Sequence, residues 1–229
     1  MSIFPPRRAD ADADARSFRL RARTRVCAHS AAVRGNRILD VGCSFGWFER
    51  FALENGAAAA TGVDVDDQAL AVARRLVPQA AFLRAAAAEL PYADASFEVV
   101  TLFDVLEHVP RRTEADVLAE ARRVLVRGGQ LALTTPHRHW LPMVADPAWY
   151  LGHRHYRLRD VVALAEQAGF VVTRTVGGIY DTLDRLAYYC WRHVLHREQH
   201  PFETVRARAD GEWDRDGRNT IVLLATAER

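Results

Sequence analysis

Three side chains that could take part in metal or acid–base chemistry lie together near the middle of the sequence: Asp104, Glu107 and His108. If this segment forms one helical turn, they stand at positions i, i+3 and i+4 and share one face. Two carboxylates and an imidazole on one face can hold a divalent metal; the oxygens favour Mg²⁺ or Mn²⁺, and the imidazole would also accept iron or zinc. A further ligand would have to come from a distant histidine, and the run Gly152-His153-Arg154-His155-Tyr156 offers two.

A second pattern with chemical meaning comes earlier and consists of a glycine loop between two acids. The apolar run from Ile38 to Val41, interrupted by Asp40, predicts a buried parallel strand, and Gly42 and Gly46 then allow a sharp turn into a helix. Such a loop presents backbone N–H groups to a ligand at the helix N-terminus. About eighteen residues later a second predicted strand ends at Asp64, whose carboxylate could accept both hydroxyls of a ribose.

Together these features resemble the class I S-adenosylmethionine (SAM) dependent methyltransferases, closely over about residues 34–170 and loosely over the last strand. The first motif of that family is an acid followed by Gly-x-Gly-x-Gly, and here Ser44 replaces the middle glycine. A nicotinamide cofactor is disfavoured, because the fingerprint G-x-G-x-x-G would need glycine at Ser44 and Trp47. The resemblance implies SAM as the cofactor, with contacts from Asp40, Gly42, Ser44, Gly46, Asp64, Val65, Ala87 and Phe103.

The segment expected to meet the adenine ring departs from the family pattern. The family usually has an aspartate five residues before the proline of Glu89-Leu90-Pro91, and this chain has Ala86 there. The adenine contact would then come from backbone groups or from Glu89. One missing hydrogen bond weakens binding by about 0.5–1.5 kcal/mol, which does not abolish it.

The acid-x-x-Glu-His segment, followed by a distant histidine, resembles the ubiquinone-pathway O-methyltransferases and the plant small-RNA 2′-O-methyltransferases. This resemblance implies that Asp104, Glu107, His108 and His153 hold Mg²⁺ or Mn²⁺, which would grip the acceptor hydroxyl. Two other interpretations stay open. His108 or His153 could instead be the general base, because imidazole takes up protons near neutral pH. Alternatively the cluster is structural, with Glu107 touching the methionine end of the cofactor through water.

Composition excludes several classes of partner. A net charge of +2, carried by 31 dispersed arginines, gives no case for a nucleic-acid partner. Three cysteines at no metal-ligand spacing indicate reduced thiols rather than disulfides. The sequence has no apolar run long enough for a transmembrane segment, and its first fifteen residues lack the apolar core of a signal peptide. We therefore expect a cytoplasmic protein.

The predicted fold class is α/β: a Rossmann-like seven-stranded mixed sheet with helices on both faces. We expect residues 1–16 to be a disordered tail and residues 17–229 to form the methyltransferase domain, beginning with a helix to about residue 33. Residues 219–225 should form a closing antiparallel edge strand. Residues 179–218 form a predicted helical insertion with one apolar face, which could pack on its own domain, cover the site, pair two subunits of a homodimer or rest on a membrane.

The sequence therefore predicts an enzyme that transfers a methyl group from SAM to a small molecule, at a hydroxyl of a sugar or phenol; metal assistance is one of the three interpretations that stay open for the acid and histidine cluster. N- or C-methylation with a histidine base would suit the same glycine loop. A SAM-binding accessory domain without activity is a further alternative, favoured by Ser44 and Ala86.

Overall fold

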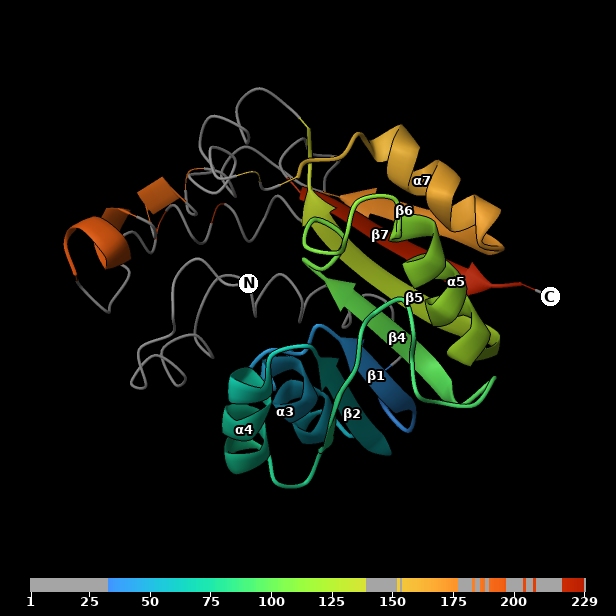
Figure 1. The fold of residues 1–229 in the computed structure, drawn as a ribbon, viewed down its shortest axis with the longest axis horizontal. Coiled ribbons are helices and arrows are strands. Elements are labelled where there is room, and N and C mark those ends of the chain that lie inside the picture. Colours follow the sequence, from blue (N-terminus) through green and yellow to red (C-terminus); the bar gives the residue numbers. More distant parts are fainter. Residues whose placement is uncertain are drawn as a thin grey trace.

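The structure is a computed structural model that describes residues 33–138, 152, 154–176, 183, 186–187, 190–196, 204, 208 and 220–228. Seven strands form one sheet in the order β3-β2-β1-β4-β5-β7-β6 (Figure 1). The strands are β1 (Arg37–Val41), β2 (Ala59–Asp64), β3 (Ala81–Arg84), β4 (Phe97–Phe103), β5 (Leu125–Pro136), β6 (Phe170–Val176) and β7 (Thr220–Ala227). The described α-helices are α3 (Trp47–Glu54), α4 (Asp67–Leu76), α5 (Glu114–Val124) and α7 (Leu158–Gln167).

The sheet is mixed, as predicted. Strands β3, β2, β1, β4 and β5 run parallel, whereas β7 pairs antiparallel with both β5 and β6. The apolar run at residues 38–41 produces this arrangement, because it is buried at every position and sits between two parallel neighbours. The predicted fold class is confirmed.

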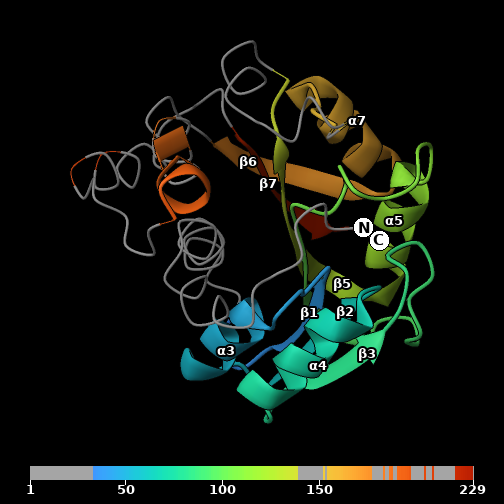
Figure 2. The same cartoon turned by 60° about the vertical axis from the view of Figure 1, so that its left-hand side comes forward.

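Helices cover both faces of the sheet (Figures 1 and 2). On one face, Val117 of α5 and Val161 of α7 join the core that includes Leu39 and Val41 of β1. On the other face, Phe48 of α3 packs in the core that includes Ile38, the residue before Leu39 in β1. α4 lies beside α3 over β2 and β3 (Figure 2). The two-residue alternation along the central strands therefore supplies two separate cores.

The predicted position of the last strand was wrong. The last strand is not at the edge: β7 lies between β5 and β6, and its residues Ile221–Leu223 are buried. The pair Gly128-Gly129 lies within β5, which begins at Leu125, directly after the end of α5. Gly128 has a positive φ of 76° and lies where the pairing of β4 with β5 shifts register. The glycines therefore serve a bulge inside β5.

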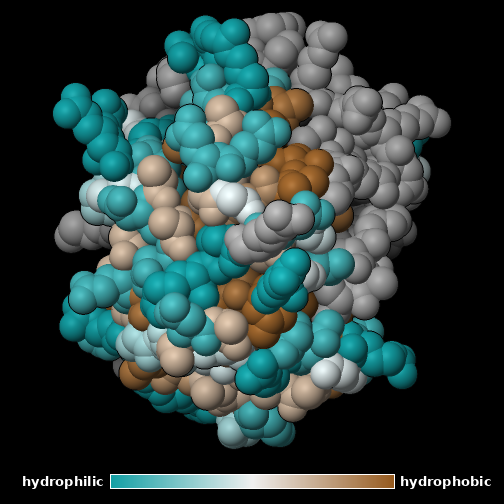
Figure 3. Space-filling model, turned by 90° about the vertical axis from the view of Figure 1, so that its right-hand side faces the viewer, coloured by the Kyte–Doolittle hydropathy of each residue, from teal (hydrophilic) through white to brown (hydrophobic). Residues whose placement is uncertain are grey.

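Much of the predicted periphery falls outside the described residues: the tail, the helix before residue 33 and most of the insertion. The described part of the insertion includes a short π-helix, η2 (Cys190–Val194), with Val194 and Leu195 exposed. The predicted homodimer and membrane contacts of the insertion stay predictions. None of the described helices has the length and hydropathy needed to span a membrane. On the face seen in Figure 3, hydrophobic residues reach the surface in small groups between hydrophilic ones.

Candidate active site

The polar residues singled out in the sequence gather at one edge of the sheet, where the parallel strands end. Val41, the last residue of β1, pairs with Val63 on one side and Leu102 on the other. Phe103, at the end of β4, pairs with Thr134 of β5. The segments that follow these strands therefore emerge side by side, at the carboxyl edge where open α/β sheets bind ligands.

The glycine loop between β1 and α3 alternates in backbone conformation. Gly42, Ser44 and Gly46 all have positive φ, at 77°, 50° and 81°. The N–H groups of Gly42 and Cys43 both donate to the carbonyl of Val63, at 2.7 and 3.0 Å. A side chain at Gly42 would lie 2.6 Å from Val105 Cγ2, so this loop packs tightly against the segment after β4. The spacing of the motif thus corresponds to three left-handed residues, of which one is not glycine.

Asp64 ties the loop to the end of β2. Its Oδ2 accepts the Ser44 N–H at 2.8 Å, and its Oδ1 accepts the Asp66 N–H at 3.0 Å. Asp66 in turn caps α4 by accepting the N–H of Gln68 at 2.8 Å. One carboxylate therefore positions the middle of the glycine loop. Beside it Val65 leaves 61% of its side chain exposed.

Two buried acidic residues, Asp40 and Glu49, lie close to the glycine loop. Asp40 is 1% exposed, and its Oδ1 accepts a hydrogen bond from Thr101 Oγ1 at 2.5 Å. Glu49 is fully buried and faces Gly62, where an added side chain would lie 2.2 Å from Glu49 Oε1. Burial, followed by the nearby carboxylates of Glu49, Asp40 and Asp64, raises the pKa of the Cys43 thiol far above its usual range. Cys43 is therefore an inert, protonated part of the packing.

The segment expected to meet the adenine ring is clamped to α5 by Arg123. This side chain donates to the carbonyls of Tyr92 at 2.7 Å and Leu90 at 2.9 Å, and pairs with Glu120 at 2.7 Å. Glu120 also accepts the Leu90 N–H at 2.8 Å. The hydrogen bond from Arg123 is the main cause that lowers the pKa of Glu120. Ala87 and the exposed Glu89 belong to this fixed segment.

The segment after β4 does not form the helical turn on which a shared face depends. Asp104 has a positive φ of 55°, and its N–H donates to the Thr134 carbonyl at 2.9 Å. Its Oδ1 accepts from Thr134 Oγ1 at 3.1 Å, whereas Glu107 is 5% exposed and accepts from Thr135 Oγ1 at 3.0 Å. The two carboxylates are thus directed to successive residues of β5.

This geometry differs from the helical turn on which the predicted metal site depends. His108 is exposed, unlike the buried Glu107, and its N–H closes a turn to the Val105 carbonyl at 2.9 Å. A left-handed residue cannot belong to a right-handed helical turn, so Asp104, Glu107 and His108 do not share a face. Among the residues that the structure describes, no three His, Cys, Asp or Glu side chains are grouped to hold a metal ion. His153, the fourth predicted ligand, lies outside the described residues.

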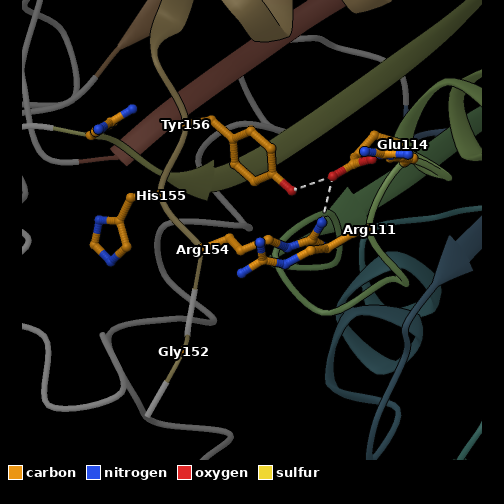
Figure 4. Close-up of a pocket in the computed structure, with 8 residues that line it drawn as sticks. Arg111, Glu114, Gly152, Arg154, His155 and Tyr156 are labelled. Carbon is orange, nitrogen blue, oxygen red and sulfur yellow. Dashed lines mark hydrogen bonds and ion pairs between the residues drawn. The ribbon is translucent and has the colours of Figure 1, made fainter. Parts of the chain in front are cut away.

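Sequence reasoning missed the residues that hold this segment in place. Arg154 donates to the carbonyls of Glu107 at 3.1 Å and Leu106 at 2.6 Å, and also to the carbonyl of Val109. The same guanidinium pairs with Glu114 at the start of α5 (Figure 4). One partly buried side chain therefore binds three carbonyls within residues 106–109 and ties this segment to α5, which the planar fork of arginine makes geometrically feasible.

Tyr156 completes this clamp. Its hydroxyl lies 2.7 Å from the Leu106 carbonyl and 3.1 Å from Glu114 Oε1. Burial is the main cause that raises the pKa of Tyr156, so the hydroxyl stays protonated and able to donate. Arg154 and Tyr156 stand two residues apart in an extended segment and point to the same side. That alternation within the histidine-rich run is the one sequence signal that could have revealed them.

His155 occupies the other side of this segment. Its Nδ1 lies 3.1 Å from the carbonyl of His137, just beyond β5. Because a carbonyl can only accept, this contact requires Nδ1–H and makes Nε2 the basic nitrogen. His155 also lines a pocket of about 640 Å³ beside Arg154 and Tyr156 (Figure 4). The structure therefore places an oriented imidazole at the carboxyl edge of the sheet.

Comparisons with known proteins identify the family. A family model described as "Methyltransferase domain" matches residues 39–133. A solved S-adenosylmethionine dependent methyltransferase from Mesorhizobium loti has a TM-score of 0.64 at 20% identity, covering 88% of this chain and 95% of that one. A ubiquinone biosynthesis O-methyltransferase from Pseudomonas aeruginosa is 32% identical over 175 residues, which are 68% of this chain and 73% of that protein. A "Probable S-adenosylmethionine-dependent methyltransferase" from Mycolicibacterium smegmatis is 31% identical over 191 residues, 82% of this chain and 70% of the relative.

This chain belongs to the SAM-dependent methyltransferases. Membership implies SAM as the cofactor of this methyltransferase and the carboxyl edge of its sheet as the place for it. Of the eight predicted cofactor contacts, Asp40 and Phe103 are each 1% exposed, so their side chains do not reach the surface of the edge. The other six lie in the glycine loop, at the end of β2 or in the segment clamped by Arg123.

Ser44→Gly is expected to stabilise the methyltransferase. A left-handed φ costs a residue with a side chain about 1–2 kcal/mol, and glycine loses about 0.5–1 kcal/mol of that gain through its greater freedom when unfolded. We expect the free energy of unfolding, measured in urea, to rise by up to about 1 kcal/mol. Affinity for S-adenosylhomocysteine should be unchanged, because the group donated to Asp64 is the backbone N–H.

Ser44→Ala is the matched control, since it removes the hydroxyl but keeps the positive φ. The free energy of unfolding of this control variant should not rise above that of the unmodified enzyme. A Ser44→Gly protein that unfolds at lower urea concentration than the unmodified enzyme would show that the serine side chain contributes more than the backbone strain removes.

Proposed function

We propose that this methyltransferase transfers a methyl group from SAM to a hydroxyl of a small molecule, a phenol or a sugar, with His155 as the general base. The observation that carries the proposal is the oriented imidazole of His155 in a pocket beside the segment that follows β4. A hydroxyl acceptor has to lose a proton, and a base that takes it typically contributes 10²–10⁴-fold to the rate. The relative from Pseudomonas aeruginosa, an O-methyltransferase by name, supports this acceptor class.

The residues at the carboxyl edge fit SAM. The carboxylate of Asp64 would accept the ribose hydroxyls in addition to two backbone N–H groups, since each of its oxygens has two lone pairs. The exposed side chain of Val65 offers an apolar surface to the adenine ring. The backbone of the glycine loop, from Gly42 to Gly46, would face the methionine part. When bound, SAM supplies a methyl group activated by its positive sulfur.

The remaining work falls to the chain itself. The acceptor would be held in the pocket between the segment after β4 and residues 154–156, so that its oxygen lies in line with the methyl group. Nε2 of His155 would take the hydroxyl proton, while Nδ1–H remains bonded to the His137 carbonyl and keeps the ring oriented. The clamp made by Arg154 and Tyr156 would fix the distance between the His155 imidazole and the hydroxyl of the acceptor. Of the two bases predicted from the sequence, His108 is exposed on the segment after β4, and the test must distinguish it from His155.

The experiment measures transfer of labelled methyl groups from SAM to a panel of catechols, simple phenols, sugars and primary amines. We expect transfer to at least one hydroxyl acceptor. His155→Gln keeps a donor for the His137 carbonyl but cannot accept a proton, so kcat at neutral pH should fall by about 10²–10⁴-fold with unchanged affinity for S-adenosylhomocysteine. His108→Gln is the matched control and should change kcat by less than about tenfold.

Three results would overturn the proposal. Transfer to amines alone would show N-methylation, and a large loss in His108→Gln but not in His155→Gln would move the base. Binding of S-adenosylhomocysteine with no transfer to any acceptor would favour the accessory SAM-binding domain instead.

A further inference from the structure

We infer that the acceptor pocket selects molecules that carry an anionic group, a carboxylate or a phosphate, and that Arg111, Arg112 and Arg138 bind this group. The inference rests on the proposed function in one respect, that this pocket receives the acceptor. Of the described residues that line the pocket, four are arginines and one, Glu114, is an acid (Figure 4). Since the whole chain has a net charge of only +2, this concentration of positive charge is local.

The four arginines fall into two groups. Arg154 is committed to the structure, because its guanidinium pairs with Glu114 and binds three backbone carbonyls. The side chains of Arg111, Arg112 and Arg138 are exposed, and within the described part of the chain they form neither a hydrogen bond nor an ion pair. Glu114 is thus already paired with Arg154, and the other three arginines carry positive charges that are available to a ligand.

These three cations come from two different elements. Arg111 and Arg112 precede α5, whereas Arg138 follows β5 and is fixed by its backbone N–H, which donates to the Tyr156 carbonyl at 2.6 Å. Arg112 is held with a positive φ of 74°, a backbone conformation that is strained for a residue other than glycine. Two ordered segments therefore bring like charges to one pocket, although like charges repel each other.

The chemistry of the side chains identifies the ligand. A guanidinium presents a planar set of donors that matches a carboxylate or a phosphate in a bidentate manner. His155 lines the same pocket, so an acceptor whose anion lies on the arginines would bring its hydroxyl within reach of the imidazole. A volume of about 640 Å³ accommodates one ring with such a substituent. A hydroxybenzoate and a sugar phosphate share this chemistry.

The test titrates the enzyme, saturated with S-adenosylhomocysteine, with benzoate, phenyl phosphate and neutral phenol in a calorimeter. We expect one or both anions to bind, more weakly as NaCl is raised, and phenol to bind at least tenfold more weakly. Benzoate alone would identify a carboxylate site, and phenyl phosphate alone a phosphate site. Arg112→Gln and Arg138→Gln should each weaken anion binding about tenfold or more.

Arg127→Gln is the matched control, since Arg127 is an exposed arginine at the opposite end of β5. It should bind the anions as the unmodified enzyme does. Equal affinities for phenol and the anions, or equal losses in Arg127→Gln and Arg138→Gln, would overturn the inference. The labelled-methyl assay tests the proposed function separately. Arginine-dependent anion binding without methyl transfer would support the anion site and contradict the proposed function. Methyl transfer to neutral acceptors that Arg138→Gln does not change would support the proposed function and contradict the anion site.

Discussion

Asp64→Asn is expected to weaken the binding of S-adenosylhomocysteine by about thirtyfold or more, which corresponds to about 2 kcal/mol. Both carboxylate oxygens already accept backbone N–H groups, Oδ2 from Ser44 and Oδ1 from Asp66. An asparagine has one oxygen and one NH₂ group, so one of these two donors would face another donor. The variant therefore loses the charge that would bind the ribose and also the contact that positions the glycine loop. Isothermal titration calorimetry measures the affinity.

Asp67→Asn is the matched control for this change. Asp67 lies three residues further on, has two thirds of its side chain exposed, and pairs only loosely with Arg84 at 3.4 Å. Loss of its charge should change the affinity by less than about twofold, because an exposed ion pair contributes little. If Asp64→Asn binds S-adenosylhomocysteine as tightly as Asp67→Asn does, Asp64 does not hold the ribose.

Arg154→Ala is expected to lower the free energy of unfolding by about 3–5 kcal/mol. The change removes a partly buried cation, together with its ion pair to Glu114 and its hydrogen bonds to three backbone carbonyls. The side chains of Arg154 and Glu114 are 16% and 15% exposed, so solvent replaces these contacts only in part. Urea denaturation followed by circular dichroism measures the loss.

Two further variants make this prediction specific. Arg154→Lys should lose most of the same free energy, because a lysine ammonium cannot reach the carbonyls and Glu114 together. Arg159→Ala, on an exposed side chain that touches its neighbour Asp160 at 3.4 Å, should change stability by less than about 0.5 kcal/mol. A lysine variant as stable as the unmodified enzyme would show that charge alone, not the fork of the guanidinium, holds the segment.

Local sequence patterns were sufficient to predict the elements that are determined by residues close together in the chain. The buried run at residues 38–41 and the glycine loop follow from hydrophobic periodicity and glycine spacing within a few residues. The position of Asp64 at the end of the next strand follows in the same way. These elements are also the ones that carry the family resemblance, so the fold class and the cofactor could both be predicted.

The acceptor side depended on contacts between distant residues. The shared face of Asp104, Glu107 and His108 was wrong because Asp104 turns left-handed to bond Thr134, thirty residues away on β5. Likewise, β7 lies inside the sheet because it pairs with strands on both sides, which no pattern within residues 219–225 encodes.

The clearest case is the run at residues 152–156. The sequence directs attention to its histidines as ligands or bases, whereas the structure assigns the largest number of contacts to Arg154. Its partners are backbone carbonyls more than forty residues away. Every residue type has a carbonyl, so no residue pattern marks the acceptors. The sequence was therefore enough to identify a SAM-binding α/β domain, and only the tertiary structure decided which side chains shape the pocket for the acceptor.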